Sequence, residues 1–151
     1  MGGYPQVVLF GSMQGGWREA SVIPVLEELG VSYYHPASPT GEWYQELGDR
    51  EADYMAHCET IVMVINTLSP AFTSLTEAGW AALGACQRGQ QFILQIDSGC
   101  DFILPDSIRQ TEEGRHLQRQ LTHWTTSSRH LVLEHARHFD METFALVDDL
   151  D

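Results

Sequence analysis

The run Ile61-Val-Met-Val-Ile65 constrains the fold more than any other part of this chain. It is apolar, β-branched and five residues long, which is typical of a buried strand rather than of a helix. Ser74 follows it as a good N-cap, and the helix that it opens carries Glu77 in its first turn. Because the pocket of an open α/β sheet lies outside the carboxyl ends of its strands, we expect Glu77 at a pocket mouth.

Helix capping offers a simpler reading of the same glutamate. Ser74-x-x-Glu77 has the spacing of a capping box, in which the glutamate reciprocates the serine cap and favours the helix dipole. On the local pattern alone, this structural role is the commoner one.

The remaining segments alternate between strand and helix without an internal repeat. Gly30 falls at the C-cap position of the first helix, and the turn-rich run from Ala37 to Gly41 follows the second strand. We predict further strands at Gln6–Gly11, Val31–Tyr34, Phe92–Ile96 and His130–Glu134, and further helices at Trp17–Leu29, Glu42–Cys58, Ile108–Trp124 and Met141–Leu150. This alternation predicts one α/β domain over residues 1–151, with a five-stranded parallel sheet of flavodoxin-like (Rossmann-like) order and helices on both faces.

Charge and composition exclude several function classes. The chain has 21 acidic and 8 basic residues, a formal net charge of -13 and no lysine. It therefore lacks a Schiff-base lysine and a Walker-type lysine, and its acidic field would repel a nucleic-acid backbone. No apolar run is long enough to span a membrane, no leader is visible, and the three cysteines form no disulfide framework. We expect a cytoplasmic protein with no membrane and no nucleic-acid partner.

Several short motifs resemble the nucleoside 2-deoxyribosyltransferase-like family. They are spread over about residues 6–96, and their combination is more specific than any one of them. The motifs are Val8-Leu-Phe-Gly-Ser12, Gly16-Trp-Arg18, Ile23-Pro-Val-Leu26, Tyr33-Tyr-His-Pro36, Trp43 and Ser74-Leu-Thr-Glu77.

This resemblance implies N-glycosidic bond chemistry on a nucleoside or nucleotide, with Glu77 attacking the anomeric carbon. A carboxylate can stabilise or trap an oxocarbenium-like centre, after which water completes a hydrolysis or a second base completes a transfer. Three positions depart from the family pattern. Leu9 takes the place of a tyrosine, Ala71 takes the place of an aspartate, and a further aspartate falls near Ala52, where Glu51 or Asp53 is the nearest substitute.

Other candidate substrate-binding residues lie at strand ends or beside loops. Gly11 and Ser12 end the first strand, where a glycine admits a ligand to the backbone and a hydroxyl offers a hydrogen bond, although an ordinary turn explains both. Trp17 and Trp43 could stack on a base, and Trp17 fits a core anchor better. Further candidates are Tyr34, at the end of the second strand, and His35, Asn66 and Ser74, for which a turn or cap role is the alternative.

Metal and thiol chemistry are weaker hypotheses. The pairs His135/His138 and His116/His123 lack partners at the spacing of a zinc site, and a histidine-rich helix is usually a solvated face. Cys58 and Cys86 lie in apolar segments that favour inert buried thiols. We therefore predict no metal and no cofactor.

Two alternative functions remain open. A Phe-Gly-Ser strand, a helix from Arg50 to Cys58 and a helix-borne Glu77 are also similar to TIR-type domains, which cleave the nicotinamide bond of NAD. The other alternative is a non-catalytic module that binds a nucleotide-like ligand or assembles with partners. The scarcity of cations, with only Arg18 and Arg50 well placed, favours an uncharged nucleoside over NAD.

The family resemblance also implies a homo-oligomer in which the C-terminal segment of a neighbour closes the site. The candidate arm is the segment 139–151, and docking of a last helix on its own sheet explains that segment equally well. Its apolar residues are Phe139, Met141, Phe144, Leu146 and Val147.

Overall fold

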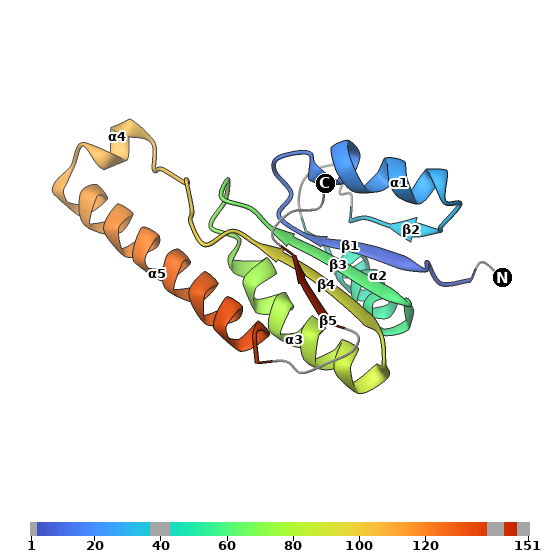
Figure 1. Cartoon of the computed structure of the whole chain (residues 1–151). Helices are drawn as coiled ribbons and strands as arrows, with labels where there is room; N and C mark the ends of the chain where they lie inside the picture. The colour runs from blue at the N-terminus through green and yellow to red at the C-terminus, as the bar shows by residue number, and fades with distance from the viewer. Residues whose placement is uncertain (1–2, 37–42, 139–143, 148–151) are drawn as a thin grey trace.

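The computed structural model is an α/β fold built on an all-parallel sheet, and this confirms the predicted class. The structure describes residues 3–36, 43–138 and 144–147. The strand order is β2-β1-β3-β4-β5, so the order reverses between β1 and β3 (Figure 1). The strands are β1 (Val7–Gly11), β2 (Tyr33–Tyr34), β3 (Thr60–Ile65), β4 (Gln91–Ile96) and β5 (Phe144–Val147).

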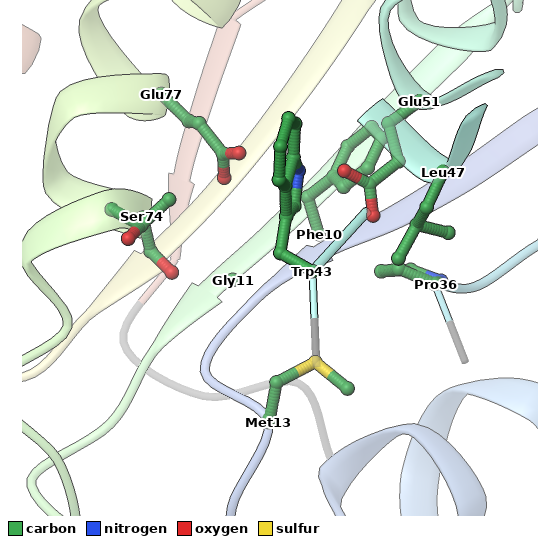
Figure 2. Close-up of a pocket in the computed structure, with 10 residues that line it drawn as sticks. Phe10, Gly11, Met13, Pro36, Trp43, Leu47, Glu51, Ser74 and Glu77 are labelled. Atoms are coloured by element: carbon green, nitrogen blue, oxygen red, sulfur yellow. The ribbon is translucent and has the colours of Figure 1, made fainter. Parts of the chain in front are cut away.

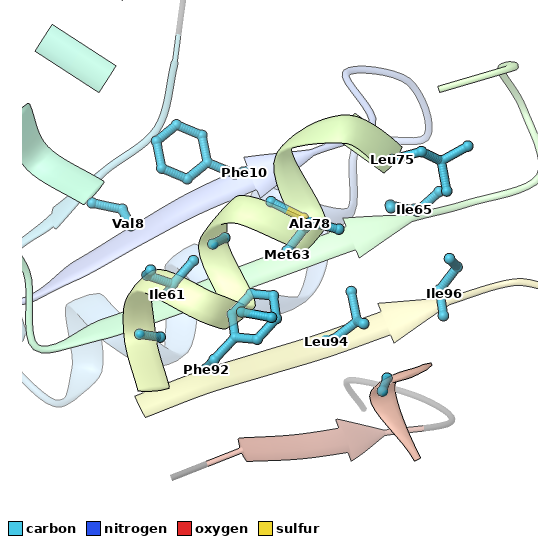
Figure 3. Packing of buried hydrophobic residues seen from close by; sticks show 14 of the residues in the cluster. Val8, Phe10, Ile61, Met63, Ile65, Leu75, Ala78, Phe92, Leu94 and Ile96 are labelled. Atoms are coloured by element: carbon cyan, nitrogen blue, oxygen red, sulfur yellow. The ribbon is translucent and has the colours of Figure 1, made fainter. Parts of the chain in front are cut away.

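Three long helices pack against one face of the sheet. They are α2 (Gln45–His57), α3 (Phe72–Arg88) and α5 (Glu112–Ala136). Alternate strand residues such as Phe10, Met63 and Leu94 are almost fully buried beneath the alanine-rich inner side of α3 (Figure 3). This period of two is what a strand requires when one set of side chains faces a helix layer.

The opposite face is covered by a shorter helical segment near the first strand. A π-helical turn, η1 (Arg18–Val22), runs into α1 (Ile23–Glu28), whose second residue is a proline. Their apolar side chains pack against Leu9 and Val62. The crossover from one face to the other between β1 and β3 leaves a crevice at the carboxyl edge of the sheet, where α/β folds bind ligands.

The C-terminal third differs from the sequence-based prediction. The fifth strand predicted at His130–Glu134 is wrong, because these residues belong to α5, which begins after the cap of Thr111. A short helix, α4 (Asp106–Arg109), precedes α5. Between Gly114 and residue 138 the chain has no glycine or proline, so nothing ends the helix early.

The final helix predicted at Met141–Leu150 is wrong over residues 144–147, which form β5 beside β4. The rest of that helix, and much of the proposed C-terminal arm, lies outside the described residues. The turn predicted over residues 37–41 also lies outside them. Within the described ranges, no helix combines the length and the apolar character needed to span a membrane.

Candidate functional site

A pocket of about 360 Å³ opens at the carboxyl end of β1, between α2 and α3 (Figure 2). It brings together five of the residues predicted for the site: Gly11 from β1, Trp43 and Glu51 from the α2 side, and Ser74 and Glu77 from α3. The other described lining residues are Phe10, Met13, Pro36, Leu47 and Thr73.

The helix that carries Glu77 begins earlier than the capping-box pattern predicted. Its N-cap is Ala71, whose carbonyl accepts the amide of Leu75 at 2.8 Å, and Ala71 makes no side-chain capping bond. Ser74 and Glu77 are therefore inside α3, and no acidic residue lies in its first turn. The predicted capping box is therefore wrong, and helix capping does not explain the presence of a carboxylate at position 77.

The backbone at Ala71 is unusual. Its φ of 53° lies in the left-handed region, and it is the one non-glycine residue of the described chain with a positive φ. An alanine in this region costs about 1 kcal/mol because its Cβ crowds the following carbonyl. Local strain of this kind clusters at functional sites, and here it fixes the direction in which α3 leaves the loop.

Two carboxylates face the pocket from different helices. Figure 2 shows the carboxyl groups of Glu77 and Glu51 directed toward the space around the Trp43 ring. Burial, and to a lesser extent the charge of Glu51, raise the pKa of Glu77 from 4.5 to about 7. Burial also raises the pKa of Glu51. No described lining residue is a lysine, arginine or histidine, so nothing in the lining neutralises the pair.

The indole of Trp43 forms an exposed wall of the pocket. Trp43 is 66% exposed, and its ring lies over Gly48 in α2, where an added Cβ would meet the ring at 2.6 Å. Gly48 therefore provides the space in which the indole rests. A flat aromatic face this exposed, beside two carboxylates, is suited to stacking on a flat ligand.

Gly11 supplies backbone rather than a side chain to the pocket. Its φ is 110°, and an added Cβ would lie 2.0 Å from the carbonyl oxygen of Val64 in the neighbouring strand. No other residue fits between β1 and β3 at this point, so a ligand meets bare main chain there.

No family model matches this chain, and the search of curated proteins found no relative.

Ser12 and Asn66 stand outside the pocket lining and hold loops together. The Ser12 hydroxyl accepts the amide of Asn66 at 3.1 Å, and its carbonyl accepts the indole N–H of Trp17 at 2.9 Å. The Asn66 side chain donates to the carbonyl of Gln14 at 2.7 Å and accepts the amide of Leu68 at 3.1 Å. This last bond is the Asx turn that was the alternative for Asn66.

Arg18 is also committed to the structure around the end of β1. Its guanidinium is buried and donates to the carbonyls of Leu9 and Ser12 at 3.2 and 3.0 Å. It lies 4.4 Å from the Trp17 ring, and burial lowers its pKa to about 10. Trp17 packs with the cluster on the opposite face of the sheet.

The other three predicted residues, Tyr34, His35 and Asp53, do not line the pocket. Tyr34 packs against Tyr54 in the main core, and its hydroxyl is buried without a partner in the described structure. Burial and the nearby Glu51 raise the pKa of Tyr34. His35 stacks beside Tyr33, and its neighbour Pro36 reaches the pocket instead. Asp53 is exposed on α2 beside His57.

Sequence reasoning missed the apolar part of the lining. Phe10 and Leu47 are buried and form apolar walls, whereas Met13 is 60% exposed at the opening. Leu47 could have been found, because it lies four residues before Glu51 on the same side of α2. Met13 and Thr73 carry no local signal that would place them there.

The thiols and histidines form no further centre among the described residues. Within the described ranges, no three His, Cys, Asp or Glu side chains are grouped so that they could hold a metal. Cys58 is buried, and burial raises the pKa of its thiol to about 11. Cys86 was expected to be buried, but it lies on the exposed side of α3.

Proposed function

We propose that this protein cleaves or transfers the N-glycosidic bond of a nucleoside, with Glu77 as the nucleophile. The observation that carries the proposal is the pocket itself, in which Glu77 has a pKa of about 7 beside a second carboxylate and an exposed indole. The flavodoxin-like strand order and the position of the pocket at the carboxyl edge of the sheet support it.

In the first step, a Glu77 carboxylate oxygen attacks the anomeric carbon while the bond from that carbon to the base nitrogen breaks. The electron pair of that bond leaves with the base, which takes up a proton, and a glycosyl ester remains on Glu77. Water or the N–H nitrogen of a second base then attacks the same carbon and loses a proton to the Glu51 carboxylate, while the bond from that carbon to the Glu77 oxygen breaks and restores the Glu77 carboxylate. The first outcome is hydrolysis, and the second is deoxyribosyl transfer.

The cavity favours a reaction that develops positive charge. An oxocarbenium-like sugar between Glu77 and Glu51 would neutralise two partly desolvated carboxylates, and this stabilisation grows as the bond breaks. Glu51 is the second acidic group of the pocket and is suited to hold a proton for the leaving base. Trp43 would stack on that base.

The charge of the pocket favours an uncharged nucleoside over NAD or a nucleotide. A phosphate would need a cation, and the buried Arg18 is held by strand carbonyls while the exposed Arg50 is not part of the described lining. The TIR-like alternative is weaker for this reason.

The test is release of free base by the wild-type protein and by Glu77→Gln. Deoxynucleosides, ribonucleosides, their monophosphates and NAD are incubated with each protein, with and without a second base, and the products are separated by chromatography. We expect at least a 1,000-fold loss of kcat/KM in Glu77→Gln with folding intact. Glu46→Gln, an exposed change on α2, is the matched control. Equal activity of Glu77→Gln and wild type would overturn the assignment.

The pH profile separates a nucleophile from an acid at Glu77. A nucleophile must be ionised, so kcat/KM should rise as pH rises toward about 7, the pKa of Glu77, and should fall again where Glu51 loses the proton that it holds for the leaving base. A profile that falls with rising pH through the same value would assign Glu77 as the general acid.

A binding module without turnover is the second candidate. Phe10 favours this candidate. It is a strand side chain that reaches the pocket, and its ring has no hydroxyl that could hold Glu77 in position for attack. Leu9 points to the other face of the sheet. Nucleoside binding measured by calorimetry, without released base from wild type, would select this candidate.

A further inference from the structure

Helix α5 extends beyond the body of the protein, and Figure 1 shows its N-terminal half projecting with α4 away from the sheet. Its 25 residues correspond to about 37 Å of helix. In the projecting half, Gly114 is buried against the carbonyl of Ile108, and Gln118 bonds the segment before α4. The residues that fix α5 to the body, Thr125, Arg129 and Ala136, all belong to its other half.

A row of large apolar side chains runs along α5 outside these anchoring residues. Leu117, Trp124 and Leu131 are 43%, 50% and 57% exposed. They are spaced by seven residues, so they share one side of the helix. Single exposed apolar residues are ordinary, whereas a heptad row of three is the pattern of a helix that pairs with another helix. We call these three residues the α5 row.

The row is symmetric in a way that fits a second copy of the same helix. Trp124 lies seven residues from both Leu117 and Leu131, and eleven residues from both Glu113 and His135. An antiparallel pair centred on Trp124 therefore places each leucine opposite the other leucine, and the acidic first turn opposite the histidine-bearing last turn. Antiparallel pairing also opposes the helix dipoles favourably.

Charge makes α5 the suitable place for two copies of an acidic chain to meet. The whole chain has a formal net charge of -13, but the exposed residues of α5 include three glutamates and two arginines, because its third arginine, Arg129, is buried, so its surface is close to neutral. Contact along α5 therefore brings less like charge together than the net charge of the whole chain would suggest.

We propose that two copies of this chain form an antiparallel helix pair through α5, with Trp124 at the twofold axis. Leu117 of one copy packs against Leu131 of the other, and Glu113 faces His135. The interface is isologous, because the same row serves both copies. This inference is independent of the chemistry proposed for Glu77.

The first test measures mass by sedimentation over a range of protein concentrations. We expect a dimer for wild type, and a rise of about 30-fold or more in the dimer dissociation constant for Trp124→Glu, as for a central interface tryptophan. Leu29→Glu, at a 68% exposed position after α1, is the control and should leave the constant unchanged. Circular dichroism establishes that each variant is folded.

Disulfide cross-linking tests the register without relying on that variant. In a background with Cys86→Ser and Cys100→Ser, a protein carrying both Leu117→Cys and Leu131→Cys should form covalent dimers when diamide oxidises the thiols. Leu117→Cys alone should not, because the two copies of that position would lie about 21 Å apart along the pair.

Three results would overturn the proposal. They are a wild-type monomer at every concentration, a dimer that Trp124→Glu leaves intact, and cross-linking of Leu117→Cys alone with an efficiency equal to that of the double variant. The last result would indicate a parallel pair or a contact elsewhere.

Discussion

Two groups of charged side chains lie at the same carboxyl edge of the sheet. One is compensated by hydrogen bonds within the protein, and the other has no cation among the described residues around it. At the ends of β3 and β4, the fully buried Arg129 donates to the carbonyls of Ile65, Asp97, Asn66 and Ser69 at 3.3, 3.1, 2.9 and 2.8 Å. At the end of β1, Glu77 and Glu51 face a cavity, and no described lining residue supplies a cation.

The difference separates a charge that the fold compensates from a pair of carboxylates that it leaves uncompensated. A buried ion that is hydrogen-bonded on several sides holds segments together, and its burial is compensated. A carboxylate that is partly buried without compensation lowers stability, and perturbed carboxylates of this kind are common at ligand sites, which supports the role proposed for Glu77. The same reasoning assigns Arg18 to structure, because its guanidinium is bound to strand carbonyls.

Loss of the compensated charge should have the largest effect on stability. Arg129→Met leaves four carbonyls without their donor, and we expect the free energy of unfolding to fall by about 3–5 kcal/mol. Urea denaturation measures the change. Arg119→Met, at an exposed position on the same helix, is the control and should change it by less than about 0.5 kcal/mol. If both substitutions lowered the free energy of unfolding equally, the hydrogen bonds of Arg129 would not stabilise the fold, and its charge would no longer differ from the uncompensated pair.

Loss of the uncompensated charge should have a smaller effect of opposite sign. The folded pKa of Glu77, about 7, lies above its ordinary value of 4.5, so its contribution to stability is lost as pH rises between these values. Glu77→Gln should therefore raise the free energy of unfolding at pH 8 by about 1–2 kcal/mol, a range reduced for partial exposure, and give no gain at pH 4. Denaturation at both pH values, with Glu46→Gln as control, checks this; destabilisation at pH 8 would contradict it.

The smallest effect concerns the coupling of the two carboxylates. Glu51→Gln removes the second cause of the Glu77 shift but leaves the first, which is burial. We expect the pKa of Glu77 to fall below about 7 and to stay above 4.5, as followed by NMR titration of labelled glutamate carboxyl groups. An unchanged pKa would show that the two groups do not interact across the pocket.

Strands β1 to β4 were predictable because the local composition of each segment indicates a strand. Ile61–Ile65 and Phe92–Ile96 are short and apolar, and the helices between strands carry glycines at their ends, as at Gly30 and Gly89. Local composition therefore defines the β1 to β4 region to within a few residues.

The C-terminal third was not predictable in the same way. The run Leu131-Val-Leu133 is as apolar as the runs that form strands elsewhere in the chain. Helix α5 nevertheless continues through it, because no glycine or proline precedes it within the helix after Gly114 and Arg129 fixes the helix to the end of β3. A three-residue apolar run does not distinguish strand from helix. The anchoring depends on carbonyls that lie 32 to 64 positions earlier in the sequence.

The site was predicted only in part. Residues placed by the local pattern were found, whereas contacts between residues far apart in the sequence were not. Gly11 lies at the strand end that the pattern located, Ser74 and Glu77 lie inside the helix that the pattern expected to begin at Ser74, and all three reach the pocket. Ser12 and Asn66 lie at similar ends, but they bond to each other, and no sequence pattern reveals that pairing. Position at a strand end alone does not distinguish a pocket residue from a loop residue.

The close approach of Gly11 to Val64 has a consequence for how this pocket can change over evolution or by design. One wall is main chain that tolerates no side chain, because a Cβ at Gly11 would overlap the neighbouring strand. The facing wall, with Leu47 and Trp43, belongs to α2 and its approach, where side chains can be exchanged without disturbing the sheet. Substitutions at Trp43 and Leu47 would therefore change the shape of the pocket and its ligand preference, while the wall at Gly11 stays the same.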